Sequence, residues 1–386
     1  MINSRKSSTI IISTDSFKGS LSAHQACTII SKAFSDSLKD EYNINVNPVP
    51  LSDGGEGLID VIKDHIDGEI NSAIVSDALG NKIEVDYLIY CSDNTKTAIL
   101  EMASVVGLYM LDESEKNPMN TSTFGFGELI LDALDKEVSN FVIGIGGTST
   151  NDGGFGMLKA LGVRFLEDGV VLEGNSPSSM FGLTGIDVSS IDSRLCDSSF
   201  VVACDVNNPF CGDLGASRVF AEQKGADLNC VEDLDSILSN FALVIKKFLG
   251  RDIINEPGSG AGGGVGGTLL AFLDAELKSG IKAIMDITGF SELVESADIV
   301  ITGEGKTDAQ TLNGKVVLGV TDLATLHNKR VIILSGSLGD GYEYLENLGL
   351  VEVFAADSYG DAGDNFERAD KVLYDAAFII AKLVYP

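Results

Sequence analysis

Acidic and basic side chains recur beside glycines at five places in the chain, each where a short apolar segment ends. The residues concerned are Asp15 with Lys18, Asp53 with Glu56, Asp152, Asp205, and Glu304 with Lys306 and Asp308. None of these places pairs a cysteine or serine with a histidine in the way that covalent catalysis needs. Carboxylates can accept a hydroxyl proton or hold Mg²⁺, and cations can bind a phosphoryl group during its transfer. The residue types therefore favour phosphoryl transfer over acyl transfer and redox chemistry.

Each of these residues has a simpler explanation when it is taken alone. A single Asp at the end of a strand commonly caps a helix or sits in a turn, and a lysine in a loop is usually solvated. Open parallel sheets, however, bind their ligands beyond the carboxyl ends of the strands. The repetition of acids and cations at that one topological position is what indicates a site.

The loop around Asp152 is a candidate cradle for a phosphate or a carboxylate. It follows the apolar segment 141–145 and leads into a helical pattern from Phe155. Glycines let a backbone approach an anion closely, and polar groups at a helix start supply hydrogen bonds. The candidate binding residues are Gly146, Gly147, Thr148, Ser149, Thr150 and Asn151. The loop is neither a Walker A motif, which needs a lysine after the glycines, nor a GxGxxG fingerprint, which needs a third glycine.

Purely structural explanations exist for this loop and for two other patterns. The loop around Asp152 could be an ordinary strand-to-helix turn with a Ser, Thr or Asp cap. The glycine-dense run 258–267 contains a formal GxGxxG, but no predicted strand precedes it, so we reject a dinucleotide site there. Cys204 and Cys211 could be imagined as metal ligands, but with three histidines in the chain they are better explained as buried thiols.

The elements that carry these loops predict two α/β domains. Strands alternate with helices in the last third of the chain, which is typical of a parallel, doubly wound sheet. The strands are expected at 298–303, 330–337 and 351–356, and the helices at 317–327, 342–348 and 365–384. The N-terminal segment continues the same pattern with a strand at 9–13 and a helix at 22–39. The first domain is therefore expected to be discontinuous.

The middle of the chain has a different pattern. Between about residues 69 and 101 the apolar period changes to two, with turn signals between the segments, which predicts an antiparallel meander. A strand within 200–210 is expected to deliver Asp205 and Asn207 at its end, and a helix is expected to run from the glycine-dense run to about Leu277. The predicted boundaries are 1–67 with 290–386 for a Rossmann-like doubly wound domain, and 68–289 for an inserted mixed α/β domain.

Composition limits the partners. The chain has 386 residues, 44% of them hydrophobic, which is enough for more than one hydrophobic core. A net charge of −30 argues against nucleic acid and against anionic membrane surfaces, so an anion site must bring its own positive potential. Six cysteines without CxxC spacing indicate a reducing cytoplasm. No signal peptide is recognised, and no apolar run reaches the roughly 18 residues of a membrane span.

Nine motifs, taken together and in order, resemble those of the bacterial glycerate kinase family of the two-domain type. They are DSFKGSLSA (15–23), SDGGEG (52–57), EMASVVGL (101–108), GELILDAL (127–134), GIGGTSTNDGG (144–154), VACDVNNP (202–209), GASRVFAEQKGA (215–226), GSGAGGGVGG (258–267) and ITGEGKTDAQTLNGK (301–315). The resemblance covers nearly the whole chain. The sequence departs from the family pattern at three positions. A proline is usual at the positions of Thr14 and Val317, and a small or hydroxyl residue is usual at the position of Phe126. These departures affect the shapes of local loops.

The resemblance implies two unlike α/β domains with an active site in the cleft between them. It also implies that ATP and Mg²⁺ are used to phosphorylate D-glycerate to 2-phosphoglycerate in the cytoplasm, by a monomer or homodimer. A 3-kinase that makes 3-phosphoglycerate and a non-catalytic regulator that binds hydroxy acids or sugar acids remain as alternatives. A dehydrogenase is disfavoured because no strand-linked GxGxxG is followed by an acid about 20 residues later.

Roles within this reaction can be assigned as hypotheses. Asp205 is expected to accept the hydroxyl proton, because an apolar strand delivers it to a place where it can be rigid and partly desolvated, and Lys18 is expected to assist catalysis. The residues expected to bind substrate and phosphates are Asp15, Ser16, Gly146, Gly147, Thr148, Ser149, Thr150, Asn151, Asn207, Arg218, Lys224, Gly303 and Lys306. The expected metal or ribose contacts are Asp53, Glu56, Glu304 and Asp308.

Overall fold

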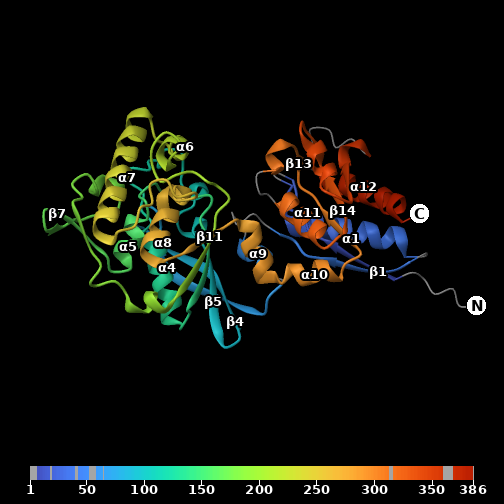
Figure 1. The fold of residues 1–386 in the computed structure, drawn as a ribbon, viewed down its shortest axis with the longest axis horizontal. Helices are drawn as coiled ribbons and strands as arrows, with labels where there is room; N and C mark the ends of the chain where they lie inside the picture. Colours follow the sequence, from blue (N-terminus) through green and yellow to red (C-terminus); the bar gives the residue numbers. More distant parts are fainter. Residues whose placement is uncertain are drawn as a thin grey trace, which may run out of the picture. The chain divides into compact units, whose positions relative to one another are not determined.

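The structure is a computed structural model that divides into two compact units (Figure 1). It describes residues 7–17, 20–39, 42–51, 58–63, 65–312, 316–359 and 368–385. The first unit contains Met1–Asp53, Asp60–His65 and Ile284–Pro386, and the second contains Gly54–Ile59 and Ile66–Ala283. Three predicted site residues, Lys18, Asp53 and Glu56, lie outside the described residues.

The first unit is built on a five-stranded parallel sheet in the order β16-β14-β12-β1-β2. Its strands are β1 (Ser7–Ile12), β2 (Asn43–Pro48), β12 (Ile299–Thr302), β14 (Arg330–Ser335) and β16 (Val351–Ala355). All four strand pairings are parallel, for example Ile12 beside Ile301. The predicted parallel, doubly wound sheet is therefore confirmed.

Helices pack on the faces of this sheet because alternate strand residues are apolar on both sides. Ile10, Ile301 and Leu334 share one buried cluster with side chains of α1 (Ala23–Leu38) and α12 (Ala369–Val384), which lie side by side. The alternate residues are also buried and face the other side, where α11 (Val316–Leu326) contacts β12 and β14. Ser22 and Gln25 form a capping box that fixes the start of α1.

The shorter elements complete the first unit. They are α10 (Phe290–Ser296), β13 (Lys306–Thr307) and β15 (Ser337–Leu338). The unit boundary falls within α2 (Leu58–Ile62) and α9 (Gly280–Thr288), so each of these two helices has residues in both units. Residues 342–347, expected to be α-helical, form a 3₁₀ helix.

The second unit is built on a six-stranded mixed sheet in the order β11-β10-β6-β5-β4-β3. Its strands are β3 (Gly68–Ser76), β4 (Lys82–Ser92), β5 (Thr95–Glu101), β6 (Asn140–Gly144), β10 (Ser199–Ala203) and β11 (Glu276–Lys278). β3, β4 and β5 pair antiparallel, as the meander prediction required, whereas β5, β6, β10 and β11 pair parallel. Asp93 and Asn94 turn the chain between β4 and β5 with φ values of 51° and 62°.

Helices and a small sheet surround the mixed sheet. The helices are α3 (Ala103–Val106), α4 (Phe124–Asp135), α5 (Phe155–Ala160), α6 (Ala216–Phe220), α7 (Leu228–Leu249) and α8 (Val265–Leu273), and the small sheet contains β7 (Arg164–Glu167), β8 (Val170–Val171) and β9 (Gly185–Asp187). Phe155, Phe165 and Phe241 form an aromatic cluster, with ring centroids 4.5 to 6.4 Å apart. This cluster anchors α5 and α7 in one core.

The helix expected to reach Leu277 ends earlier. α8 stops at Leu273 because Asp274 adopts a left-handed conformation, with φ 52° and ψ 34°. The residues after it form β11, which pairs with β10. The prediction was wrong here because β11 is only three residues long, too short to leave an alternating pattern in the sequence.

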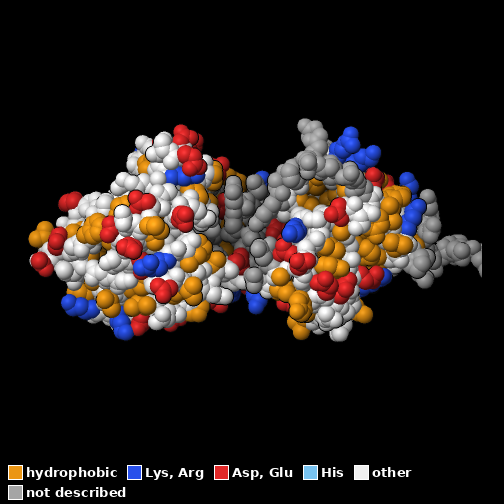
Figure 2. Space-filling view, turned by 90° about the horizontal axis from the view of Figure 1, so that it is seen from above, with side chains coloured by type: hydrophobic (Ala, Val, Ile, Leu, Met, Phe, Trp, Pro, Cys, Tyr) orange, Lys and Arg blue, Asp and Glu red, His pale blue; other side chains and the backbone are white. Residues whose placement is uncertain are grey.

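Charged side chains are spread over the visible surface of both units, with acidic groups interspersed among a smaller number of Lys and Arg (Figure 2). This distribution agrees with a net charge of −30. Among the described residues, no helix is long and apolar enough to cross a membrane.

Candidate functional site

The loop after β6 presents its glycines to solvent and keeps its hydroxyl groups inside. Gly146 and Gly147 are exposed, whereas residues 148–151 are buried. The Ser149 hydroxyl donates to Val106 O over 2.9 Å, and Thr121 Oγ1 donates to Ser149 O over 3.1 Å. The buried hydroxyl groups therefore brace the loop, and the backbone at Gly146 and Gly147 remains as the accessible surface for an anion.

Asp152 has a structural role at the start of α5. Its carboxylate is fully buried and accepts hydrogen bonds from Thr123 N, Thr123 Oγ1, Gly154 N and Gly156 N, at 2.7 to 3.1 Å. Burial raises the pKa of Asp152 above its ordinary value, although these hydrogen bonds oppose the rise. The contacts of Asp152 therefore support a structural role at the start of α5, although the N-cap residue of this helix is Gly154.

The glycine-dense run 258–267 packs directly against this loop. Gly153 N donates to Gly263 O over 2.9 Å, and a Cβ atom added to Gly263 would lie 2.1 Å from Thr150 O. Gly262, Gly263 and Gly264 have φ values of 61°, 69° and 96°, a conformation that favours glycine. These glycines serve the close packing of two loops.

Substituting Gly263 tests this packing. We expect Gly263→Ala to lower the urea midpoint of unfolding well beyond the cost of backbone strain, because its Cβ has no room beside Thr150 O. Gly169→Ala is the matched control, because Gly169 also has a positive φ of 87° but no atom within 4 Å of an added Cβ. Equal effects of the two substitutions would contradict the packing explanation.

Asp205 and Asn207 lie just beyond the carboxyl end of β10, as predicted. Asp205 Oδ1 accepts a hydrogen bond of 2.9 Å from Gly280 N, at the start of α9. Both residues are exposed, so the expectation that Asp205 is partly desolvated is wrong. The physical reason is that the strand ends at Ala203 and carries the acid past the sheet into solvent. The hydrogen bond nevertheless orients the carboxylate.

Arg218 lies within α6, and Lys224 is the last residue of the short 3₁₀ helix 222–224 that follows α6, but their environments are opposite. Arg218 is exposed, with Nε 3.5 Å from Asp235 Oδ2. Lys224 is buried, and its Nζ donates to Thr150 O over 2.6 Å and reaches Thr148 Oγ1 at 3.4 Å. Burial lowers the pKa of Lys224 to about 8, although the charge of Asp152 opposes the shift. Lys224 thus approaches the glycine loop from inside the protein.

In the first unit, the expected residues gather where β1 and β12 end. Asp15 N donates to Gly303 O over 2.9 Å, and Asp15 Oδ1 accepts from Ser16 N over 2.6 Å. Glu304 is buried, and its Oε1 accepts hydrogen bonds from the hydroxyl groups of Thr307 and Thr311, at 3.2 and 2.5 Å. The parallel pairing of β1 with β12 brings these separate motifs together.

Lys306 and Asp308 form the more open part of this group. Lys306 Nζ lies 3.4 Å from Asp308 Oδ2, and the lysine side chain is 60% exposed. Gly336 N donates to Glu304 O, and Gly339 N donates to Thr307 O, so the segment is held against the loop after β14. Lys306 therefore offers an accessible cation beside the Asp308 carboxylate.

The oxygen donors of Glu304 and Asp308 suit Mg²⁺, which binds through one or two carboxylates together with phosphate oxygens and water. The described residues contain no group of three or more His, Cys, Asp or Glu side chains that could hold a metal ion by itself.

Sequence reasoning missed several polar residues that support these loops. Thr307 and Thr311 hydrogen-bond Glu304, and Thr307 Oγ1 lies 2.6 Å from Ser335 Oγ. The hydroxyl groups of Ser13, directly after β1, and of Thr302, the last residue of β12, are buried without a hydrogen-bond partner in the described part of the chain. The spacing of Glu304, Thr307 and Thr311 in the sequence was the signal that could have indicated these hydrogen bonds.

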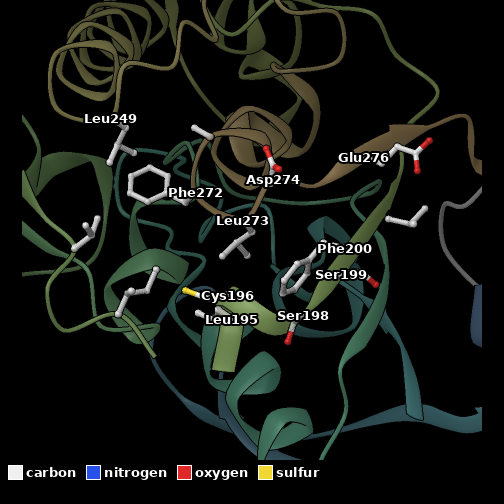
Figure 3. Close-up of a pocket in the computed structure, with 14 residues that line it drawn as sticks. Leu195, Cys196, Ser198, Ser199, Phe200, Leu249, Phe272, Leu273, Asp274 and Glu276 are labelled. Atoms are coloured by element: carbon white, nitrogen blue, oxygen red, sulfur yellow. The ribbon is translucent and has the colours of Figure 1, made fainter. Parts of the chain in front are cut away.

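A cavity of about 690 Å³ in the second unit is separate from these groups (Figure 3). It is lined largely by apolar side chains, including Leu195, Phe200 and Phe272. It lies at the amino end of β10, whereas Asp205 follows the carboxyl end of that strand. None of the predicted site residues lines it.

Comparison with known proteins gives a consistent result. The family model described as "Glycerate kinase family" matches residues 10–385. The chain is 40% identical to glycerate kinase of Halalkalibacterium halodurans, over 97% of each protein. It is also 40% identical to glycerate 2-kinase of Escherichia coli K12, over 94% of this chain and 96% of the relative. A crystal structure described as "putative glycerate kinase 2 from Salmonella typhimurium LT2" matches with a TM-score of 0.83 and 35% identity, over 98% of both chains.

Proposed function

Because the chain belongs to the glycerate kinase family and is a kinase, we propose that it transfers the γ-phosphoryl group of ATP to D-glycerate and releases ADP and 2-phosphoglycerate. The observation that carries this proposal is the family match over residues 10–385. Attack by the 2-hydroxyl is supported by the name of the Escherichia coli relative, glycerate 2-kinase. Attack by the 3-hydroxyl, which gives 3-phosphoglycerate, is the alternative.

In the proposed mechanism, Asp205 accepts the proton of the glycerate hydroxyl group. The hydroxyl oxygen forms a bond to the γ-phosphorus, and the bond from that phosphorus to the ADP oxygen breaks. Asp205 suits the role because its exposed carboxylate is accessible, and because the hydrogen bond from Gly280 N fixes its orientation. Asn207, exposed two residues later, is a candidate for orienting glycerate.

Binding of the two anions is assigned to the remaining accessible groups. The exposed backbone of Gly146 and Gly147 and the Arg218 guanidinium are candidates in the second unit. In the first unit, Lys306 is the candidate cation for ATP phosphates, and Asp15, Ser16 and Gly303 are further candidates in that unit. Thr148, Ser149, Thr150, Asn151 and Lys224 are assigned a supporting role, because they are buried. Lys18 keeps its assigned role in catalysis.

Mg²⁺ is part of the proposal, and Glu304 and Asp308 are the described residues that would hold it, with Asp53 and Glu56 as further candidates from the sequence. The metal would neutralise charge on the phosphates of ATP. Glu304 is held in place by the hydroxyl groups of Thr307 and Thr311. Removal of divalent cations with EDTA is therefore expected to abolish turnover, and added MgCl₂ is expected to restore it.

A cytoplasmic location is also proposed. It is supported by six cysteines, all of them free thiols in the structure, which suit a reducing compartment. The proposal requires no protein partner, and a monomer or a homodimer would suffice.

The identity of the product is the sharpest test of this proposal. Purified protein is incubated with ATP, Mg²⁺ and D-glycerate, and the phosphorylated carbon is located by ³¹P and ¹³C NMR. In the proton-coupled ³¹P spectrum, splitting by the single hydrogen on carbon 2 is expected, whereas splitting by the two hydrogens on carbon 3 would replace the proposal with the 3-kinase. Glycerol, which lacks the carboxylate, is the control substrate and is expected to be phosphorylated poorly. Binding of D-glycerate without any product would favour a non-catalytic regulator.

A further inference from the structure

Lys224 is unusual among the cations of this chain because its charged end lies inside the second unit. Only 4% of the residue is exposed, and Nζ donates to Thr150 O over 2.6 Å. A lysine in a loop is ordinarily solvated, and burying its ammonium group costs free energy unless the group is paired or hydrogen-bonded. The hydrogen bond to Thr150 O offsets this cost and holds the ammonium group against the glycine loop.

The contacts of Lys224 fall on the inner side of the glycine loop. Nζ also lies 3.4 Å from Thr148 Oγ1, so one ammonium group contacts both residues that flank Ser149. Ser149 O is held by Thr121 Oγ1 over 3.1 Å. Polar groups of residues 148–150 are thereby turned inward, and Gly146 and Gly147 are left at the surface.

Lys224 also brings positive charge to the underside of a loop that is proposed to bind an anion. The protein has a net charge of −30, so an anion approaching its surface is repelled unless a local positive potential compensates this repulsion. A buried ammonium group is screened less by water and salt than an exposed one. Lys224 can therefore act on an anion at Gly146 and Gly147 without contacting it.

We propose that Lys224 is a positioning residue, which holds the Thr148–Thr150 segment from beneath and so sets the shape and potential of the Gly146–Gly147 backbone for an anion. This inference rests on the proposed function, and it adds a residue that acts through the loop. The anion is an oxyanion, either the carboxylate of glycerate or a phosphate of ATP.

The charged groups around Lys224 come from several elements. Asp152, at the start of α5, is the one whose charge acts on the pKa of Lys224. Arg218 on α6 is 3.5 Å from Asp235 on α7, so these two charges pair with each other. Glu222, two residues before Lys224 in the chain, is exposed, and Lys116, whose carbonyl approaches Gly225, pairs with Glu113.

Replacing Lys224 with methionine tests the inference, because methionine has a similar length and no charge. We expect Lys224→Met to raise the KM for the substrate whose anion binds at the loop by at least tenfold, with a smaller change in kcat. KM is measured separately for D-glycerate and for ATP, which distinguishes the two sources of the anion. A variant with both KM values unchanged would overturn the inference.

The pH profile supplies a readout that a purely structural role would not move. The pKa of Lys224 is about 8, so its cation is present below that pH and lost above it. Wild-type kcat/KM is therefore expected to fall as the pH rises through about 8, and the kcat/KM of Lys224→Met is expected not to show this fall. The same fall of kcat/KM in both proteins would contradict the inference.

Lys159 provides a matched control. It is partly buried in the same unit, its Nζ donates to Leu172 O and Gly174 O at 2.9 and 2.5 Å, and burial lowers its pKa. Lys159→Met removes these hydrogen bonds to a hairpin away from the glycine loop. The stability of the protein is therefore expected to fall while both KM values stay unchanged. Equal kinetic defects in the two variants would assign the effect of Lys224 to general destabilisation and overturn the inference.

Binding measurements distinguish a failure of this inference from a failure of the proposed function. Inorganic phosphate and D-glycerate are titrated separately by calorimetry into wild type and Lys224→Met without ATP. Weaker binding of either probe to the variant supports the inference even if no product forms. A wild type that phosphorylates D-glycerate, together with a variant that binds both probes equally well, would retain the function and remove the inference.

Discussion

Asp205→Asn is expected to lower kcat for D-glycerate phosphorylation by about 10²- to 10⁴-fold and to leave the fold unchanged. The amide cannot accept the hydroxyl proton at neutral pH, but its oxygen can still accept the hydrogen bond from Gly280 N that Asp205 Oδ1 now accepts over 2.9 Å. Loss of activity therefore isolates the proton-accepting role from the positioning of the loop. Steady-state kinetics and near-UV circular dichroism measure the two properties.

Asp274→Asn serves as the control for Asp205→Asn. Asp274 is also an exposed acid of the second unit, and its carboxylate lies 2.8 Å from Arg251. It lies at the end of α8, where it lines the apolar cavity, and it is not assigned to the site. Wild-type turnover is expected for Asp274→Asn. Turnover close to wild type in Asp205→Asn would withdraw the role of Asp205.

The second large effect is expected for stability, from Asp152→Ala. The substitution leaves the four donors around Asp152 without their acceptor in a fully buried place, and it removes the charge that compensates Lys224. Breaking a buried, hydrogen-bonded charge of this kind costs about 3–5 kcal/mol of unfolding free energy. Urea denaturation followed by circular dichroism measures this loss, and anion binding is expected to weaken with it, because Asp152 anchors the end of the glycine loop.

An exposed ion pair in the same unit gives the comparison for Asp152→Ala. Asp187 Oδ2 is 2.6 Å from Arg164 on the small sheet, in contact with solvent. Exposed pairs contribute little because water and salt screen them. Asp187→Ala is therefore expected to leave the urea midpoint almost unchanged. A similarly small change for Asp152→Ala would show that its buried hydrogen bonds are not important for stability.

The sequence was sufficient to predict the parallel sheet of the first unit and the antiparallel meander of the second, because their residues leave clear patterns. The β-branched segments at β1, β12 and β14 indicated buried parallel strands, and they pair as expected. The turn at Asp93 and Asn94 separated two segments with period two, and an antiparallel pair forms there. The resemblance to the glycerate kinase family was confirmed by a family match over residues 10–385.

The environments of individual site residues could not be predicted in the same way. Lys224 and Arg218 are six residues apart and both looked like accessible cations, yet the first is buried and the second exposed. Asp205 looked partly desolvated because an apolar strand precedes it, but β10 ends two residues earlier. Which way a long side chain turns depends on loops that are distant in the sequence, such as the run 258–267 that packs on Thr150.

Release of ADP that depends on D-glycerate is the most direct test of the central claim. Purified protein with ATP and Mg²⁺ is assayed by a coupled spectrophotometric method, first without an acceptor and then with D-glycerate, L-glycerate or glycerol. The account predicts rapid, saturable ADP release with D-glycerate and rates near background with the other two acceptors. ADP release at the background rate with D-glycerate, from protein shown to be folded, would contradict the account.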